Sequence, residues 1–265
     1  MIEASEMMET ALEAAKGAGE IIMKYFDKEK QEITKGDVDY VTIADTECEK
    51  LIVSKIKEKF PDHNIITEES GDFEKSSDYV WLIDPLDGTA NYVMEFPYFC
   101  TSIALKHKGE TLLGVVYEPL VDLLFTAEKG KGAFVNGKRM QVSKTRNLND
   151  SVMVLGVYKG YVKKIGKWDN TKNIFSRVMD NVRDFRRTGS SVLDFCYIAL
   201  GKFDARIWFG KPTPWDPPAG ELMIREAGGK VMDFKNNELS EESEGFIASN
   251  GLVHNELLKI VKEEW

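Results

Sequence analysis

Over the first sixty residues, apolar side chains recur at sequence intervals typical of α-helices. In the first stretch they recur every three or four residues, at Met7, Ala11, Ala14, Ala18, Ile21 and Tyr25. One face of a helix repeats at about 3.6 residues, so this spacing predicts an amphipathic helix. A second helix is expected over about residues 45–60, before Pro61. Its apolar positions are Cys48, Leu51, Ile52, Ile56 and Phe60.

Short apolar runs bounded by polar residues follow, and they are typical of strands. They cover residues 64–67, 79–83, 100–106, 112–118 and 122–127. The stretch GKGAFVNGKRMQV contains Asn136-Gly137 between two short strands, a dipeptide that favours a two-residue hairpin turn. We therefore expect antiparallel strands to dominate the first half of the chain.

After about residue 145 the pattern changes to alternating helices and strands. Strands are predicted over 151–157, 204–209 and FIASN, and helices over 170–181, over 190–201, from Pro217 to Gly228, and from about residue 252. No internal repeat or low-complexity linker separates the two halves. The fold class is therefore α+β or α/β, with an antiparallel-rich lobe over residues 1–145 and an α/β lobe over 146–265, packed as one unit.

Composition and charge limit the partners of the protein. The net charge of −9 argues against a broad surface for nucleic acid or an anionic membrane. The three cysteines have no metal-binding spacing, which indicates buried, reduced thiols. The chain opens on no signal-peptide pattern, and no apolar run approaches the roughly 18–20 residues that span a bilayer. We expect a cytoplasmic protein with no nucleic-acid and no membrane partner.

Acidic residues gather at the ends of three strand-like segments. They are Glu68 and Glu69 after NIIT, Asp84 and Asp87 at the end of YVWLIDPLD, and Asp216 in PTPWDPPAG. Each alone is explained as well by a helix N-cap, a place where Asp is common. Together they favour a bound cation, and carboxylate and carbonyl oxygens suit Mg²⁺. Gly88 and Thr89 come next and can open a helix whose free N–H groups receive an anion.

Longer motifs in a fixed order carry a family signature. These motifs are DYVTIADTECEK, TEES, WLIDPLDGTANYV, GVVYEP, GKGAFVNGKRMQVS, RRTGSSVLDFCYIALGKFDA and WDPPAGELMIREAGG. On these motifs the chain resembles the inositol monophosphatase family of Mg²⁺-dependent sugar phosphatases, over essentially its whole length. The resemblance implies a layered αβαβα fold, a homodimer and a phosphate monoester as substrate.

The resemblance also implies a set of metal ligands. Glu68, Asp84 and the backbone carbonyl of Leu86 match the ligands of a first Mg²⁺. Asp84, Asp87 and Asp216 match those of a second ion, and Glu68 also serves a weaker third site. Two or three ions per site are therefore expected.

Catalytic and phosphate-binding groups are implied in the same way. Glu68 and Thr89, with a partner matching Asp45, correspond to the residues that position the attacking water, and the N–H groups of Gly88 and Thr89 match a phosphate cradle. The implied mechanism is direct in-line attack by metal-activated water on the phosphate, without a phospho-enzyme. Asp45 also has a simpler interpretation, because an acidic residue at a helix start is often a cap.

Substrate contacts are implied at several further positions. They are Asp87, Ser190, Ser191 and Phe209. Ser190-Ser191 also suit a helix N-cap. Phe209 stands seven residues before Asp216, where animal members place a glutamate against an inositol hydroxyl. Phenylalanine in place of this glutamate argues against strict selectivity for inositol. The resemblance implies inositol 1-phosphate and related sugar or polyol phosphates as substrates, and a broader site that also accepts fructose 1,6-bisphosphate is the alternative.

Other interpretations concern a second function and other chemistries. Some bacterial relatives are partners of the transcription machinery, so a regulatory binding role stays open. A haloacid dehalogenase mechanism is set aside because Pro85 stands where its nucleophilic aspartate belongs. The isolated His63, His107 and His254 are expected at the surface.

Overall fold

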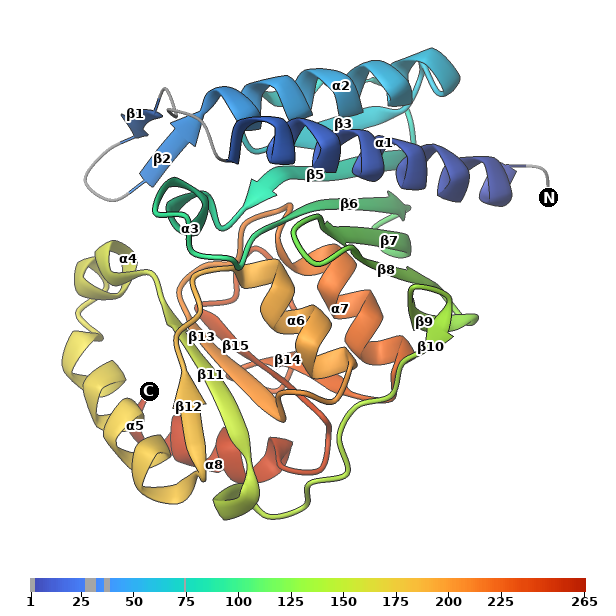
Figure 1. Cartoon of the computed structure of the whole chain (residues 1–265). Coiled ribbons are helices and arrows are strands. Elements are labelled where there is room, and N and C mark those ends of the chain that lie inside the picture. The colour runs from blue at the N-terminus through green and yellow to red at the C-terminus, as the bar shows by residue number, and fades with distance from the viewer. Residues whose placement is uncertain (1–2, 27–31, 36–38, 74) are drawn as a thin grey trace.

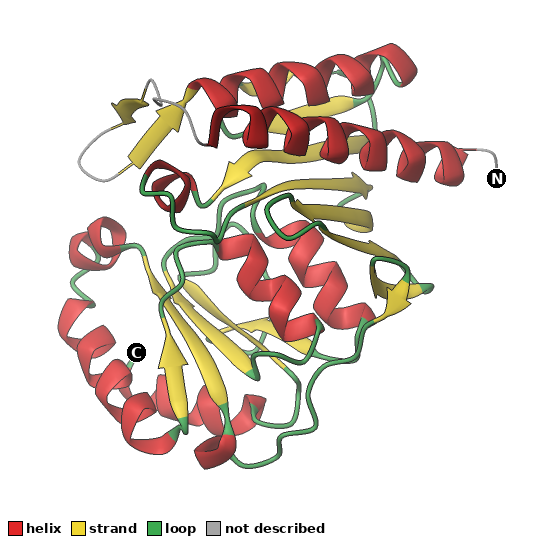
Figure 2. Cartoon of the chain, in the orientation of Figure 1, coloured by secondary structure: helices red, strands yellow, loops and turns green. Residues whose placement is uncertain are grey.

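Helical layers alternate with sheets through the whole molecule. The computed structural model describes residues 3–26, 32–35, 39–73 and 75–265. Figures 1 and 2 show helices on top, a first sheet, a middle pair of helices, a second sheet and a final group of helices. This is the αβαβα layering that the family resemblance implied.

The first sheet has eight strands in the order β10-β9-β8-β7-β6-β5-β3-β4. Its strands are β3 (Asn64–Thr67), β4 (Gly71–Phe73), β5 (Tyr79–Asp87), β6 (Cys100–His107), β7 (Glu110–Glu118), β8 (Leu123–Glu128), β9 (Gly132–Val135) and β10 (Lys138–Arg139). Neighbouring strands are antiparallel except β3 and β5, which are parallel. The prediction of an antiparallel-rich first half is confirmed.

Two long helices cover the outer face of this sheet (Figure 1). They are α1 (Glu3–Phe26) and α2 (Ile43–Lys59), and the short strands β1 (Glu32–Lys35) and β2 (Asp39–Thr42) lie between them in the sequence. Alanines dominate the buried face of α1, which lets the helix lie close to the sheet. At Gly19 a Cβ atom would come within 2.4 Å of the Tyr117 ring on β7.

The middle layer consists of α6 (Ser191–Ala199) and α7 (Pro217–Glu226). Their apolar side chains form one core with residues from both sheets. At Gly114 of β7 a Cβ atom would lie 2.8 Å from the Cα of Ala219, so α7 approaches the first sheet too closely for any side chain there. The predicted boundary between residues 1–145 and 146–265 falls between the two sheets. The middle helices contact both sheets, so the division into two lobes stays a prediction.

The second sheet has five strands in the order β12-β11-β13-β15-β14. They are β11 (Val152–Val157), β12 (Asp184–Arg186), β13 (Ala205–Phe209), β14 (Lys230–Asp233) and β15 (Gly245–Ser249). Strands β12, β11 and β13 are parallel, and β15 and β14 continue antiparallel. The remaining helices are α3 (Thr89–Val93), η1 (Leu148–Asp150), α4 (Lys159–Lys164), α5 (Trp168–Asn181) and α8 (His254–Glu264). Figure 1 shows α5 and α8 beyond the second sheet, opposite α6 and α7.

Local predictions are confirmed at the hairpin and the cysteines. Asn136 and Gly137 both have positive φ, 46° and 74°, as a two-residue hairpin turn of this type requires. Cys48, Cys100 and Cys196 are buried free thiols. Among the described helices, none is long and apolar enough to cross a membrane.

The surface prediction for the histidines is wrong for His254. Its side chain is fully buried at the start of α8, where Nδ1 lies 2.9 Å from the hydroxyl of Ser249. Because α8 packs against β15, the first turn of the helix is covered by the sheet.

Candidate active site

Strand β5 carries the DPLD segment into the interior, so this strand is longer than the predicted run 79–83. Asp84 pairs with Ser102 of β6 and Asp87 pairs with Cys100, with a bulge between the two pairs. The bulge holds Pro85, which has no N–H to give to a ladder. Both aspartates are buried, at 2% and 7% exposure. The apolar strand thus fixes two carboxyls where water scarcely reaches them.

Glu68 meets Asp84 because β3 runs parallel to β5. The N–H of Glu68 lies 3.3 Å from the carbonyl oxygen of Ile83. The carboxyls of Glu68 and Asp84 lie close enough for each to act on the titration of the other. Asp216, at the start of α7, lies close enough for its charge to act on both carboxyls. Asp216 occupies the N-cap position of α7, as the simpler interpretation expects, but its side chain makes no capping hydrogen bond to the helix.

Burial and mutual repulsion shift the titration of this group. Burial raises the pKa of Glu68 to about 8, and the charges of Asp216 and Glu69 add to the rise. Burial also raises the pKa of Asp84 well above its usual range, with further contributions from Glu68, Asp87 and Asp216. A divalent cation would relieve this repulsion, and the oxygen donors present suit Mg²⁺. Among the described residues, the side chains as they stand form no group of three or more His, Cys, Asp or Glu at ion-binding distance.

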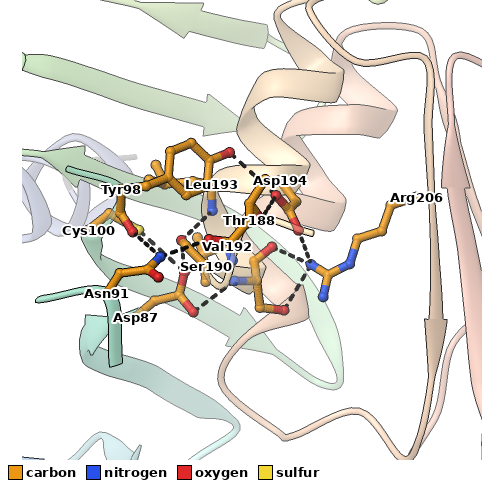
Figure 3. A network of polar contacts seen from close by, with 11 residues as sticks. Asp87, Asn91, Tyr98, Cys100, Thr188, Ser190, Val192, Leu193, Asp194 and Arg206 are labelled. Atoms are coloured by element: carbon orange, nitrogen blue, oxygen red, sulfur yellow. Dashed lines mark hydrogen bonds and ion pairs between the residues drawn. The ribbon is translucent and has the colours of Figure 1, made fainter. Parts of the chain in front are cut away.

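Asp87 contacts the first turn of α6 in the middle layer (Figure 3). Its Oδ1 accepts from the N–H of Ser191 at 3.0 Å, and its Oδ2 accepts from the N–H of Val192 at 2.9 Å and from the hydroxyl of Ser190. The thiol of Cys100 lies 3.8 Å from Oδ2. A carboxylate oxygen accepts about two hydrogen bonds, so Oδ2 is fully used and Oδ1 keeps a lone pair for an ion.

Ser190 and Ser191 begin α6, as predicted. The Ser190 hydroxyl accepts from the N–H of Leu193 at 3.3 Å, which confirms the N-cap. Ser190 is only 1% exposed and its proton goes to Asp87, so the structure gives it a capping role and no path to a substrate. Ser191 is half-buried, and its hydroxyl oxygen accepts from Arg206.

Asp45 caps α2 with one carboxylate oxygen and contacts Thr89 with the other. Its Oδ2 accepts from the N–H and the hydroxyl of Thr42, at 2.7 and 2.6 Å, and closes a capping box at the start of α2. Its Oδ1 lies 3.2 Å from the hydroxyl of Thr89, which also lies 2.9 Å from the carbonyl oxygen of Leu86. Burial raises the pKa of Asp45 to about 6. One oxygen therefore caps a helix while the other faces Thr89.

Gly88 joins β5 to α3 in the left-handed conformation. Its φ is 86°, and a Cβ atom there would lie 2.9 Å from the carbonyl oxygen of Tyr98. Within the described part of the chain, the N–H groups of Gly88 and Thr89 have no acceptor. Both remain available to an anion.

Phe209 does not lie at this site, and its assignment as a substrate contact is corrected. The side chain is fully buried and packs against the rings of Phe175, Phe234 and Trp265. Side chains alternate along a strand, so Phe209 faces α5 and α8, and Trp208 faces α6 with Arg206. The two-residue period of β13 is the sequence signal that places Phe209 and Trp208 on opposite faces of the sheet.

Glu49 was missed by the sequence argument. Its Oε2 accepts from the hydroxyl of Thr67 at 2.6 Å and from the N–H groups of Glu69 at 3.0 Å and Ser70 at 3.3 Å. It thus holds the turn that contains Glu68. The signal was present, because Glu49 lies one turn after Asp45 on the buried face of α2.

The layered fold and the buried carboxylates define one class of protein. The model of the inositol monophosphatase family matches residues 3–265, and the chain belongs to this family. Nus factor SuhB of Escherichia coli (strain K12) is 38% identical over 262 residues, covering 97% of this chain and 96% of the relative. Inositol monophosphatase 2 of Solanum lycopersicum is 40% identical over 265 residues, covering 97% and 98%. Among solved structures, the extragenic suppressor protein suhB from Bartonella henselae aligns with a TM-score of 0.92 and 33% identity, covering 98% of this chain and all (100%) of that chain.

Proposed function

We propose that this protein is a Mg²⁺-dependent phosphomonoesterase that hydrolyses inositol 1-phosphate and related sugar or polyol phosphates. The observation that supports it is the group of carboxyls at the ends of β3 and β5 and at the start of α7, of which Asp84 and Asp87 are buried and Glu68 and Asp216 half-buried. Burial and the neighbouring negative charges raise the pKa of Glu68 and Asp84. Family membership and the relative named inositol monophosphatase agree with this reaction class.

The proposed ligands of two or three Mg²⁺ ions come from three parts of the chain. They are Glu68, Asp84, the carbonyl of Leu86, Oδ1 of Asp87, and Asp216. Ions bound there supply positive charge that stabilises the phosphate and favours deprotonation of water. Asp84 is fixed for this role because its Oδ1 accepts from the N–H of Leu86 at 3.0 Å.

Thr89 and Asp45 are proposed to orient the attacking water. When the Thr89 hydroxyl donates to Oδ1 of Asp45, its oxygen lone pairs can accept a hydrogen bond from water. Asp45, with a pKa of about 6, can receive a proton near neutral pH. The N–H groups of Gly88 and Thr89 are proposed to hold phosphate oxygens, and the proton of the Ser191 hydroxyl to contact the rest of the substrate.

The test is phosphate release with and without Mg²⁺ from a small substrate panel. The panel contains inositol 1-phosphate, glycerol 2-phosphate, fructose 1,6-bisphosphate and 3′-phosphoadenosine 5′-phosphate. We expect Mg²⁺-dependent turnover, highest with inositol 1-phosphate, and a loss of more than about 100-fold in kcat/KM for Asp84→Asn. No turnover of any compound at any Mg²⁺ concentration would contradict the proposal.

A second candidate function is a binding role in transcription, because the relative from Escherichia coli is named a Nus factor. Asp84→Asn discriminates the two functions, because it should abolish turnover and leave a purely binding role intact. A homodimer and a cytoplasmic location are proposed from the family resemblance alone.

A further inference from the structure

Arg206 is a buried cation behind the candidate active site. It lies on β13, its side chain is 2% exposed, and its guanidinium carbon lies 5.4, 5.1 and 5.7 Å from the ring centroids of Phe195, Trp208 and Phe246. A charge in such surroundings needs a partner, because burial of an unpaired ion is strongly unfavourable. The position of that partner indicates what the residue does.

The guanidinium donates to the first turn of α6 (Figure 3). Its Nη1 lies 2.5 Å from the carbonyl oxygen of Ser191 and 3.0 Å from the Ser191 hydroxyl. The Ser191 carbonyl and the Val192 N–H belong to the same peptide group. That N–H donates to Oδ2 of Asp87 at 2.9 Å. One peptide group therefore lies between a cation at its oxygen and a carboxylate at its N–H.

Asp194 forms a single, long ion pair with Arg206. Its Oδ2 lies 3.4 Å from Nη1, while its Oδ1 accepts from the hydroxyls of Thr188 at 2.6 Å and Tyr98 at 3.4 Å. In the part of the chain that is described, Nε of Arg206 has no partner, so the pair is not bidentate. The guanidinium therefore lies closer to the carbonyl oxygen of Ser191, at 2.5 Å, than to the carboxylate of Asp194, at 3.4 Å.

We propose that Arg206 is a positioning residue that acts on Asp87 through the Ser191–Val192 peptide. A cation at the carbonyl polarises the peptide and strengthens the hydrogen bond at the other end. This holds Oδ2 against α6 and leaves Oδ1 directed to the bound ion. The inference rests on the proposed function only in taking Asp87 as a metal ligand.

The experiment measures Mn²⁺ binding by calorimetry on the full chain, because Mn²⁺ accepts the same oxygen ligands as Mg²⁺. Arg206→Met should weaken Mn²⁺ binding about 10- to 100-fold, as loss of an outer-shell partner does. Arg206→Lys keeps the charge and one donor and should recover most of the affinity. Arg225→Met is the control, because Arg225 also pairs with a carboxylate, Glu221, and a carbonyl, Val231, away from the site. Its Mn²⁺ affinity should stay within about twofold of wild type.

A double variant separates the proposed positioning of Asp87 from a general loss of stability caused by removing Arg206. Arg206→Met alone leaves the Asp194 carboxylate buried without its cation, so the double variant Arg206→Met with Asp194→Asn should fold better. Its Mn²⁺ affinity should nevertheless stay weak. Wild-type affinity in either variant would overturn the proposal, as would a wild-type chain that binds no Mn²⁺. If Mn²⁺ binding depends on Arg206 but no phosphate ester is hydrolysed, the proposed function fails and this inference stands.

Discussion

Asp45 uses its two carboxylate oxygens for different contacts. Oδ2 completes the capping box with Thr42, and Oδ1 faces Thr89, where we propose a role in orienting the attacking water. The cap fixes the orientation of the carboxylate, so the second oxygen needs no further support. The two functions can be separated because they use different oxygens.

We predict opposite outcomes for substitutions on the two sides of this contact. Thr42→Ala removes the hydroxyl of the capping box but keeps the backbone N–H that orients Oδ2 of Asp45, so it should lower the free energy of unfolding by about 1 kcal/mol and leave activity within about fivefold of wild type. Asp45→Asn should reduce kcat by about 100-fold or more, because the amide cannot accept a proton. Urea unfolding and steady-state kinetics on both variants measure the two effects. Equal activity losses in the two variants would contradict the separation.

The titration of Glu68 gives a second prediction at this scale. Its pKa rises from 4.5 to about 8 on folding. Between these values the folded chain binds more protons than the unfolded chain, so without divalent ions its stability should fall as the pH rises. Glu68 alone contributes a slope of at most about 1.4 kcal/mol per pH unit between pH 5 and pH 8, and the raised pKa of Asp45 adds to the slope in the lower part of this range.

Urea unfolding in EDTA across this pH range measures the slope. Glu68→Gln should flatten it, and Mg²⁺ should restore stability mainly at the high-pH end, where the ligands are deprotonated. A stability that rises with pH in EDTA would contradict the assigned burial of the carboxyls.

The sequence motifs indicated which residue types form the candidate site, but they did not indicate how the side chains are oriented in it. Carboxylates at the ends of apolar strands are unusual, which singled out the acidic residues as a group, and in the structure the charges of Asp87 and Asp216 act on the buried Asp84. The direction of each side chain depends on tertiary packing, which a motif does not encode. Phe209 was assigned by counting from Asp216, and the count ignored that its neighbour Trp208 faces α6.

At the scale of elements, the turn after β3 depends on a helix far from it in sequence. Glu49 of α2 accepts four hydrogen bonds, from the side chains of Thr67 and Ser70 and from the N–H groups of Glu69 and Ser70. All four donors belong to the turn that contains Glu68. The helix therefore sets the position of a proposed metal ligand that it does not contain.

Two substitutions test this dependence. Glu49→Leu leaves several buried donors unpaired, and we expect it to cost about 2–3 kcal/mol of stability and about 10-fold in Mg²⁺ affinity. Glu49→Gln keeps an acceptor at Oε2, and its amide can donate to the Ser70 hydroxyl, so both effects should be small. Unfolding and metal titrations on the two variants are the measurements. Unchanged Mg²⁺ affinity in Glu49→Leu would show that Glu68 does not depend on this turn.

Most elements were predictable because their signals are local. The hairpin at Asn136-Gly137 follows from backbone preferences of two residues, and α2 from its apolar period. Strand β5 was predicted too short, because the DPLD segment is paired by β6 across a bulge, which local propensity does not reveal. The sequence thus predicts an element well where local backbone preferences determine it. It misses the extent of an element where pairing with a neighbouring strand determines it.

For the whole molecule, the decisive feature is how α7 joins the two sheets. Asp216 immediately precedes this helix, which lies on the first sheet at Gly114, so the contact sets the distance between Asp216 and the carboxyls of Glu68 and Asp84. Sequence alone could not show this convergence, because the residues lie on segments more than a hundred positions apart. The packing of α7 should therefore control metal binding as well as stability.

Gly114→Ala tests that link, with Gly19→Ala as its matched control. Both substitutions overpack a helix against β7, Gly114 on the α7 side and Gly19 on the α1 side through Tyr117. Each should cost about 1–3 kcal/mol in urea unfolding. Only Gly114→Ala displaces Asp216, so only this variant should also bind Mg²⁺ more weakly, by about 10-fold, in a calorimetric titration. Equal Mg²⁺ affinities in the two variants would show that the site tolerates movement of α7, and that the ligands from the first sheet hold the ion alone.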